Sequence, residues 1–228
     1  MVKFSRTNTK KAKAAVASLK AAKSVNGNYN TPEVNAALAE MFCGKCYICE
    51  NKEGVTSFQI EHLKAHKGDA GLKYDWNNLF WACAHCNNVK RVEDEPILDC
   101  SQVDVDKKIA FRKKGYFGKD EKYEFIPLEE TVETENTVHL LHRTYYGNTP
   151  QKRMEAVNIC RALRRNLSDF KNLVREYYEA EDYDKEDILC AIKKEVGKES
   201  AFAAFKRWLL WDNEEKYGDL LRLCGLLN

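Results

Sequence analysis

The chain has 228 residues, which is enough for one large domain or for a small core with an appended domain. With 44% hydrophobic residues, 32% charged residues and a net charge of +2, it has the composition of a soluble globular protein with a buried core. It contains no apolar run that could span a bilayer, and its N-terminus lacks the apolar core of a signal peptide. We therefore expect no membrane segment.

The nine cysteines form no recognisable disulfide framework. Four of them stand in two Cys-x-x-Cys pairs, and the other five are scattered: Cys43, Cys100, Cys160, Cys190 and Cys224. This usage favours metal ligation in a reducing compartment over disulfide bonds. We therefore expect the protein in the cytoplasm.

Residues 1–30 are predicted to form a basic N-terminal arm. The first 29 residues contain no acidic residue but seven basic ones: Lys3, Arg6, Lys10, Lys11, Lys13, Lys20 and Lys23. Such a segment can lie along phosphates and make binding depend on salt. A solvated, loosely held tail explains the same composition, and the sequence does not separate the two readings.

A helix is predicted to follow the arm. Thr31 is a good N-cap, Pro32 suits the first helical position, and apolar residues then recur at helical spacing. The helix should reach about Phe42 and end near Gly44.

Two cysteine pairs, Cys46/Cys49 and Cys83/Cys86, are separated by 33 residues. Four thiolates in two pairs predict a closed, tetrahedral structural zinc site. Cys43 has the same spacing to Cys46, but it lies on the helical side of Gly44, so we assign Cys46 and Cys49 as ligands. His85, inside the second pair, is expected to point outward, and His66 receives no role.

The spacer between the pairs carries the residues that suit catalysis. Residues 55–61 predict a short strand that ends at Glu61-His62, residues 75–81 a second strand or turn, and a helix begins near Cys86. Hydrolysis of a phosphodiester needs a base for water, which a neutral imidazole supplies, and a divalent cation on hard oxygen ligands. Asn87, next to a zinc ligand, offers an amide oxygen for that cation.

The remaining chain is predicted to be a connector and a helical domain. Residues 101–136 should hold a small hairpin around Gly115 and Gly118. Within residues 137–228, we expect helices over 138–145, 154–177, 188–196, 202–211 and 220–227. In the longest of these, an apolar stripe that includes Met154 and Val157 should face the core.

At these residues the sequence resembles the HNH family, the ββα-metal nucleases. The resemblance implies that His62 is the general base, Glu61 and Asn87 are ligands of a catalytic cation, and Asn78 holds the loop that carries the base. Glu61 stands where the family more often has Asp. Asn87 in place of His favours Mg²⁺ or Mn²⁺. By the same resemblance Lys90 and Arg91 are candidates for contacts with nucleic acid.

A narrower resemblance, to the HNH subunit of Septu and retron-associated antiphage systems, rests on GKCYICE, IEH, YDWNNLFWAC, CNNVK, PILD and, more loosely, a helical tail with HLLHRTYYGNTPQKRMEA. It implies a toxic nuclease restrained by an ABC/SMC-type ATPase, with the helical half as the candidate docking platform. The alternative is a zinc module that binds nucleic acid or protein without catalysis. Such a module does not need the four candidate catalytic residues.

The sequence therefore predicts an α+β fold in which a zinc-stapled ββα-metal core, residues 31–100, precedes a mostly helical C-terminal domain. The predicted activity is phosphodiester hydrolysis with Mg²⁺ or Mn²⁺ at the active site.

Overall fold

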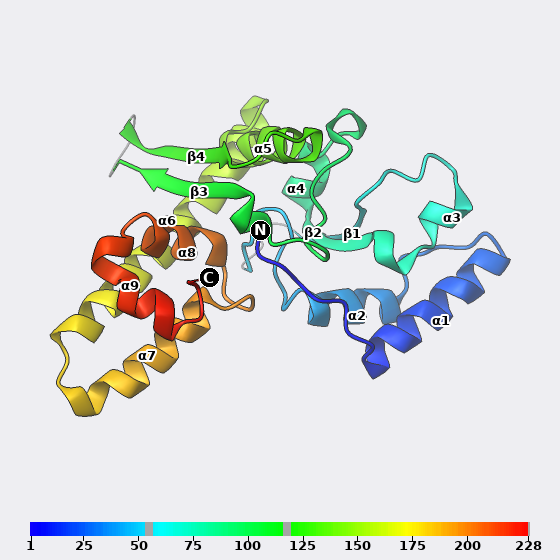
Figure 1. Cartoon of the computed structure of the whole chain (residues 1–228). Helices are drawn as coiled ribbons and strands as arrows, with labels where there is room; N and C mark the ends of the chain where they lie inside the picture. The colour runs from blue at the N-terminus through cyan, green and yellow to red at the C-terminus, as the bar shows by residue number, and fades with distance from the viewer. Residues whose placement is uncertain (53–56, 116–119, 228) are drawn as a thin grey trace.

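The computed structural model describes residues 1–52, 57–115 and 120–227 (Figure 1). It has a mixed α+β fold in which a small β-hairpin region precedes a largely helical C-terminal portion, as the sequence predicts. The first part contains α1 (Lys10–Ser24), α2 (Pro32–Met41), β1 (Phe58–His62), α3 (Ala70–Lys73), β2 (Leu79–Cys83) and α4 (Ala84–Val89). The second contains β3 (Ile109–Lys114), β4 (Lys122–Pro127), α5 (Val132–Tyr146), α6 (Pro150–Glu179), α7 (Asp182–Val196), α8 (Ala203–Trp211) and α9 (Glu214–Leu223).

Strands β1 and β2 form an antiparallel pair in which His62 lies opposite Leu79 and Phe58 opposite Cys83. Helix α4 follows β2 directly, which confirms the predicted order of strand, strand and helix. The first strand begins at Phe58, and residues 55 and 56 of the predicted strand lie outside the described residues. The pair thus places the candidate catalytic strand beside the helix that carries Asn87.

Residues 1–30 are not a loosely held tail, so that reading is wrong. Met1, Val2 and Phe4 are buried in the core, and α1 packs against α2 (Figure 1). Arg6 donates hydrogen bonds of 2.9–3.0 Å to the carbonyl oxygens of residues 76, 77 and 79. The five lysines of α1 remain exposed: Lys10, Lys11, Lys13, Lys20 and Lys23. The segment is therefore a folded part of the molecule that presents a basic surface.

Helix α2 has the predicted ends. The Thr31 hydroxyl accepts a hydrogen bond from the Val34 amide, Pro32 occupies the first turn, and Phe42 caps the C-terminus. The hairpin β3–β4 also matches its prediction, although Gly118 lies outside the described residues.

Some predicted helix bounds in the C-terminal portion are wrong. Helix α5 begins at Val132, because Thr131 accepts a hydrogen bond from the Thr134 amide and so caps a helix that starts before its apolar stripe. Helices α7 and α9 likewise begin earlier, with acidic first turns that suit the positive end of the helix dipole. In α6, Met154 and Val157 are 73% and 50% exposed, so the core-facing stripe begins after them.

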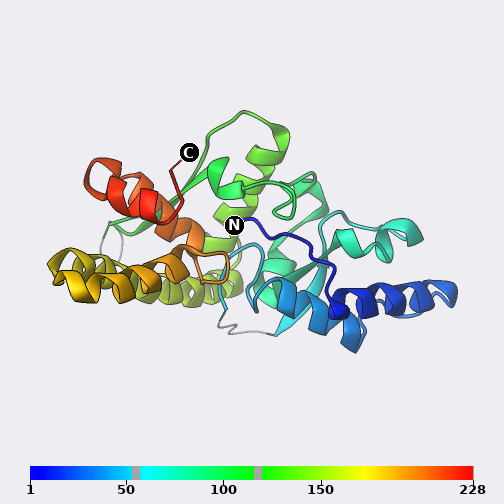
Figure 2. The same cartoon turned by 60° about the horizontal axis from the view of Figure 1, so that its bottom comes forward.

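The apolar core has two clusters. One extends from the N-terminal segment through the β1–β2 region and the β3–β4 hairpin to α5 and α8. The other lies between α6, α7, α8 and α9, where α6 and α7 run side by side (Figure 2). The first cluster draws residues from all four predicted segments, and the domain boundaries stay a prediction.

Glu50 connects the cysteine region to distant parts of the chain. Its carboxylate accepts hydrogen bonds from the amides of Val2 and Ala204, both at 3.0 Å, and lies 3.4 Å from the Lys45 ammonium. Burial alone would raise the pKa of Glu50, but the Met1 amino group, Lys45 and these amides lower it to about 2. The carboxylate therefore remains charged inside the core.

The substitution Glu50→Ala is expected to lower the free energy of unfolding by about 3–5 kcal/mol, because it leaves the buried Lys45 ammonium unpaired. Urea unfolding at pH 7 measures this loss. The matched control is Glu40→Ala, which breaks an exposed pair with Lys11 and should cost about 1 kcal/mol or less. Equal losses in the two variants would contradict the proposed importance of Glu50.

Candidate functional site

The four cysteines of the two pairs form one buried cluster. The Sγ atoms of Cys46, Cys49, Cys83 and Cys86 all lie within 4.8 Å of one another. Cys43 is outside the cluster, whose members are the four cysteines that the sequence analysis selects. Four converging thiols suit a tetrahedral zinc ion and leave no position open for substrate. The cluster is therefore consistent with a structural zinc site.

Backbone hydrogen bonds beyond the β1–β2 pair bring the two cysteine pairs together. The Tyr47 amide donates to the Trp81 carbonyl, and the Ala84 amide donates to the Ser57 carbonyl, both at 2.9 Å. The Tyr145 hydroxyl of α5 donates to the Cys49 carbonyl at 3.0 Å. The cysteine cluster is thus held by the strands and by a helix far along the chain.

His85 does not point outward as expected. Its ring is 3% exposed and lies between Glu155 of α6, 2.7 Å from Nδ1, and the Thr144 carbonyl of α5, 2.9 Å from Nε2. A carbonyl oxygen only accepts hydrogen bonds, so Nε2 carries a proton. His85 therefore connects α4 to α5 and α6. Both of its ring nitrogens are hydrogen-bonded within the protein, so it is not a candidate for catalysis.

His62 lies at the end of β1 in a defined orientation. Its Nε2 atom is 3.0 Å from the Lys73 carbonyl oxygen, which can only accept, so Nε2 carries the proton and Nδ1 retains the lone pair. The rings of Tyr29 and His66 pack against it, with centroids 4.7 and 4.8 Å away. Burial lowers the pKa of the imidazole, which favours its neutral form near pH 7. A fixed, neutral imidazole with one free lone pair can act as a general base.

Asn78 binds the loop between β1 and α3 through its amide. Its Oδ1 atom accepts from the Lys64 amide at 2.8 Å, and its Nδ2 atom donates to the carbonyls of Lys64 and Leu72 at 2.9 and 3.1 Å. The Leu72 contact lies one residue before Lys73, whose carbonyl orients His62. Asn78 is therefore placed to fix helix α3, whose Lys73 carbonyl orients the imidazole.

Glu61 has a crowded, buried carboxylate. The Tyr47 hydroxyl donates to Oε2 at 2.6 Å, and the Lys90 ammonium lies 2.8 Å from Oε1. Burial raises the pKa of Glu61 to about 7, although both partners favour the charged form. A divalent cation would offset the cost of burying this charge.

Asn87 is directed toward the same face of β1 as Glu61. Its Nδ2 atom donates to Gln59 Oε1 at 2.7 Å, and residues 59 and 61 share one face because side chains alternate along a strand. The Asn87 Oδ1 atom accepts no hydrogen bond within residues 1–52, 57–115 and 120–227. A buried carboxylate and a free amide oxygen on one face fit a hard cation such as Mg²⁺ or Mn²⁺.

The candidate contacts to nucleic acid differ in exposure. The Lys90 side chain is 5% exposed, and its ammonium contacts Glu61, Glu95 and the His62 carbonyl. Arg91 is exposed. The Lys90 ammonium thus stabilises the carboxylates of Glu61 and Glu95 in this structure. Contacts of Lys90 or Arg91 with phosphate stay a prediction.

Sequence reasoning missed the neighbours that orient the candidate residues. Tyr29 comes from the segment before α2, the Lys73 carbonyl from α3, and Tyr47 from the first cysteine pair. Only Tyr47 had a local signal, its position between two cysteines of the cluster.

No described helix is long and apolar enough to cross a membrane.

Comparisons with known proteins agree with this geometry. The family model described as HNH endonuclease matches residues 43–93. The chain is similar to Septu protein PtuB of Bacillus mycoides (strain KBAB4), with 36% identity over 83 residues, covering 30% of this chain and 28% of that protein. The match thus spans less than a third of the relative, and no solved structure matches. Residues 43–93 are therefore an HNH endonuclease domain, in a chain distantly related to Septu protein PtuB.

Proposed function

We propose that this chain is a metal-dependent endonuclease that hydrolyses phosphodiester bonds in nucleic acid, with His62 as the general base. The observation that carries the proposal is the hydrogen bond from His62 Nε2 to the Lys73 carbonyl, which leaves Nδ1 free to accept a proton. His62 is the last residue of β1, where the backbone turns, so it can approach the same site as Glu61, whose strand face also receives Asn87. This position supports the proposal.

In this proposal His62 Nδ1 takes the proton from the attacking water, and burial keeps the ring neutral beforehand. Asn78 keeps in place the loop after β1 and helix α3, whose Lys73 carbonyl orients His62. Glu61 and Asn87 would hold Mg²⁺ or Mn²⁺, which supplies neutralisation of the scissile phosphate and stabilisation of the leaving oxygen. Proton transfer, support of the base and cation binding are then divided among the four candidate residues.

The exposed lysines of α1 offer a surface for the phosphates of the substrate. Lys20 and Lys23 line a groove between α1 and the segment 71–77 that also contains the Trp76 ring, and Lys13 lines a neighbouring hollow at Trp76. Cations beside an aromatic ring suit a nucleic-acid strand, whose bases stack and whose phosphates need neutralisation. Arg91 would add a contact on the α4 side.

We further propose that the chain is the toxic effector of an antiphage defence system in the cytoplasm and works with an ABC/SMC-type ATPase. Its similarity to Septu protein PtuB supports this role. The helical residues 137–228 are the proposed docking surface. Co-elution of the purified chain with such an ATPase tests the association, and separate elution at micromolar concentrations contradicts it.

Substitution of Asn87 tests the cation site. Asn87→Ala is expected to weaken Mn²⁺ binding by at least about 10-fold and to reduce cleavage in parallel, because an oxygen ligand is lost. The control is Asn88→Ala, the exposed neighbouring asparagine, which should change neither quantity. Calorimetric titration with Mn²⁺ gives the affinity, and zinc content is checked in both variants.

A zinc module without catalysis is the alternative function. It predicts that Asn87→Ala and Asn88→Ala behave alike, with no Mn²⁺ bound by either variant or by the parent. That result would overturn the nuclease proposal.

A further inference from the structure

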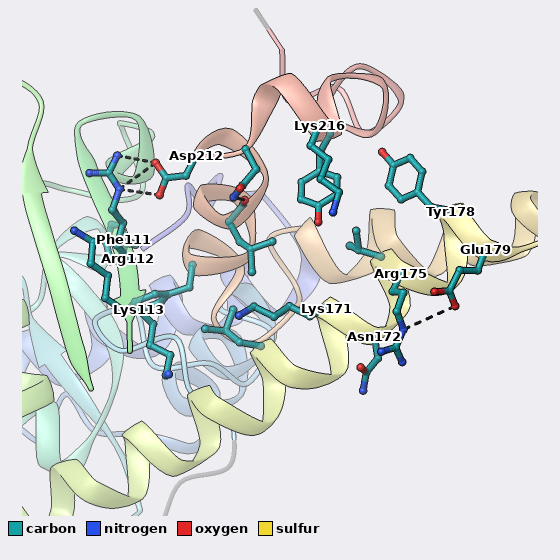
Figure 3. A pocket seen from close by; sticks show the side chains of 17 residues that line it. Phe111, Arg112, Lys113, Lys171, Asn172, Arg175, Tyr178, Glu179, Asp212 and Lys216 are labelled. Carbon is teal, nitrogen blue, oxygen red and sulfur yellow. Dashed lines mark hydrogen bonds and ion pairs between the residues drawn. The ribbon is translucent and has the colours of Figure 1, made fainter. Parts of the chain in front are cut away.

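A second candidate binding site lies far along the chain from the HNH region. A cleft of about 700 Å³ opens between β3, α6, and the junction of α8 with α9 (Figure 3). None of its lining residues belongs to residues 43–93. Its chemistry therefore needs an explanation of its own.

The rim of this cleft is strongly basic. Six of the lining residues are cationic: Arg112, Lys113, Lys114, Lys171, Arg175 and Lys216. Glu179 and Asp212 are the acidic lining residues. The Asp212 carboxylate forms a bidentate ion pair with the Arg112 guanidinium, with distances of 2.6–3.0 Å. The rim thus holds more positive than negative charge before any ligand binds.

Among the residues that the structure describes, two of these cations have no carboxylate partner. Lys113 and Lys114 lie within 3.2 and 2.8 Å of glutamates on the β4 side, and Arg175 lies 3.9 Å from Glu179. Lys171 and Lys216 form no ion pair with any residue in the described part of the chain. They come from α6 and α9, on two sides of the cleft (Figure 3). The Lys216 ammonium lies over the Tyr217 ring, 5.1 Å from its centroid. Two ammonium groups without a carboxylate partner in the described residues, on two sides of a cleft, are suited to an anionic ligand.

The floor and one wall of the cleft are apolar and aromatic. Buried Phe111, Leu167 and Val174 contribute to the floor. On the wall, the rings of Tyr178 and Tyr217 lie 5.8 Å apart at an angle of 32°, and the Tyr178 hydroxyl donates to Asp219 at 2.5 Å. A planar ring system could stack here while its charged part reaches the rim.

We propose that this cleft binds nucleotide phosphates, with a base or sugar against the tyrosine wall and the phosphates between Lys171 and Lys216. The combination of unpaired cations with an aromatic wall favours nucleotides over a ligand that is only acidic. The phosphates come either from a free nucleoside triphosphate or from a strand of nucleic acid. The inference does not depend on the catalytic role of His62.

Charge reversal at the two unpaired lysines tests the site. The full-length variant Lys171→Glu/Lys216→Glu is compared with Arg165→Glu/Lys193→Glu, which makes the same charge change at exposed positions of α6 and α7 outside the cleft. The probes are ATP, measured by calorimetry, and a fluorescein-labelled single-stranded 12-mer, measured by anisotropy, both without added divalent cation. Thermal unfolding verifies the fold of each variant. Lys171→Ala/Lys216→Ala, which removes the two charges without reversing them, is a second cleft variant measured in the same way.

The cleft variant is expected to bind at least one probe about 10-fold more weakly or worse, and the control within about 2-fold of the parent. For the 12-mer, the plot of log binding constant against log salt concentration has a negative slope, and its magnitude should decrease by about 1–2 in the cleft variant. Loss for both probes indicates a site for nucleotides in general, and loss for the 12-mer alone indicates a strand site. Equal effects of the two variants, or a glutamate 12-mer that binds as tightly as the oligonucleotide, would overturn the proposal.

Discussion

Cys83→Ser is expected to abolish zinc binding and to unfold the region from Cys46 to Val89. The strands and α-helices described in this region are two five-residue strands, the four-residue α3 and the six-residue α4, too little to bury an independent core. Structural zinc contributes about 10–16 kcal/mol to the folding of comparable zinc-finger peptides. We expect zinc content to fall from about one ion per chain to near zero, and the melting temperature to fall with it.

Zinc analysis by mass spectrometry and thermal unfolding measure the two effects on the same samples. Cys190→Ser is the control, because Cys190 is exposed and lies outside the cluster. It should retain both the zinc and the melting temperature of the parent. Retention of zinc by Cys83→Ser would contradict the assignment of the four ligands.

His62→Ala is expected to reduce cleavage by about 10²–10⁴-fold, the usual contribution of a positioned general base. Zinc content should stay unchanged, because His62 lies outside the cysteine cluster. Initial rates on plasmid DNA or total RNA with saturating Mn²⁺ measure the effect. The control is His139→Ala, which makes the same change at an exposed position of α5.

A His62→Ala variant that retains zinc and cleaves at the rate of the parent would exclude His62 as the base. A variant that loses zinc would instead show that His62 has a structural task. The two results are distinguished by measuring metal content before each assay.

The sequence predicted those parts of the structure that short-range signals determine. Thr31 and Pro32 mark the start of α2 by capping and by a preset backbone angle, which act within one turn. The cysteine spacing identified the four clustered cysteines, because two such pairs are expected to meet at one ion. These predictions needed no knowledge of the packing between distant segments.

Helix α1 was missed because its apolar signal is weak. Its buried positions are Ala12, Ala15 and Leu19, and two small alanines barely stand out among five lysines. The helix is stabilised by packing on α2, which is a tertiary contact. A lysine-rich composition alone could not distinguish this helix from a solvated tail.

The environment of the candidate site also depends on tertiary contacts. Lys90 follows the second cysteine pair and looks like a ligand for phosphate, yet its ammonium lies between Glu61 and Glu95. That contact is set by the distance between β1 and α4, which spacing along the chain does not reveal. The same holds for Tyr29, whose ring packs against His62 from a segment that precedes α2.

The most direct test of the central claim is cleavage of plasmid DNA and of total RNA by protein whose zinc content has been verified, as Mn²⁺ is added stepwise. The proposal predicts that zinc-filled protein alone is inactive and that Mn²⁺ starts cleavage of at least one polymer, because the cysteine cluster leaves no open position for substrate. Cleavage of neither polymer at saturating Mn²⁺, or full cleavage with zinc alone, would contradict it.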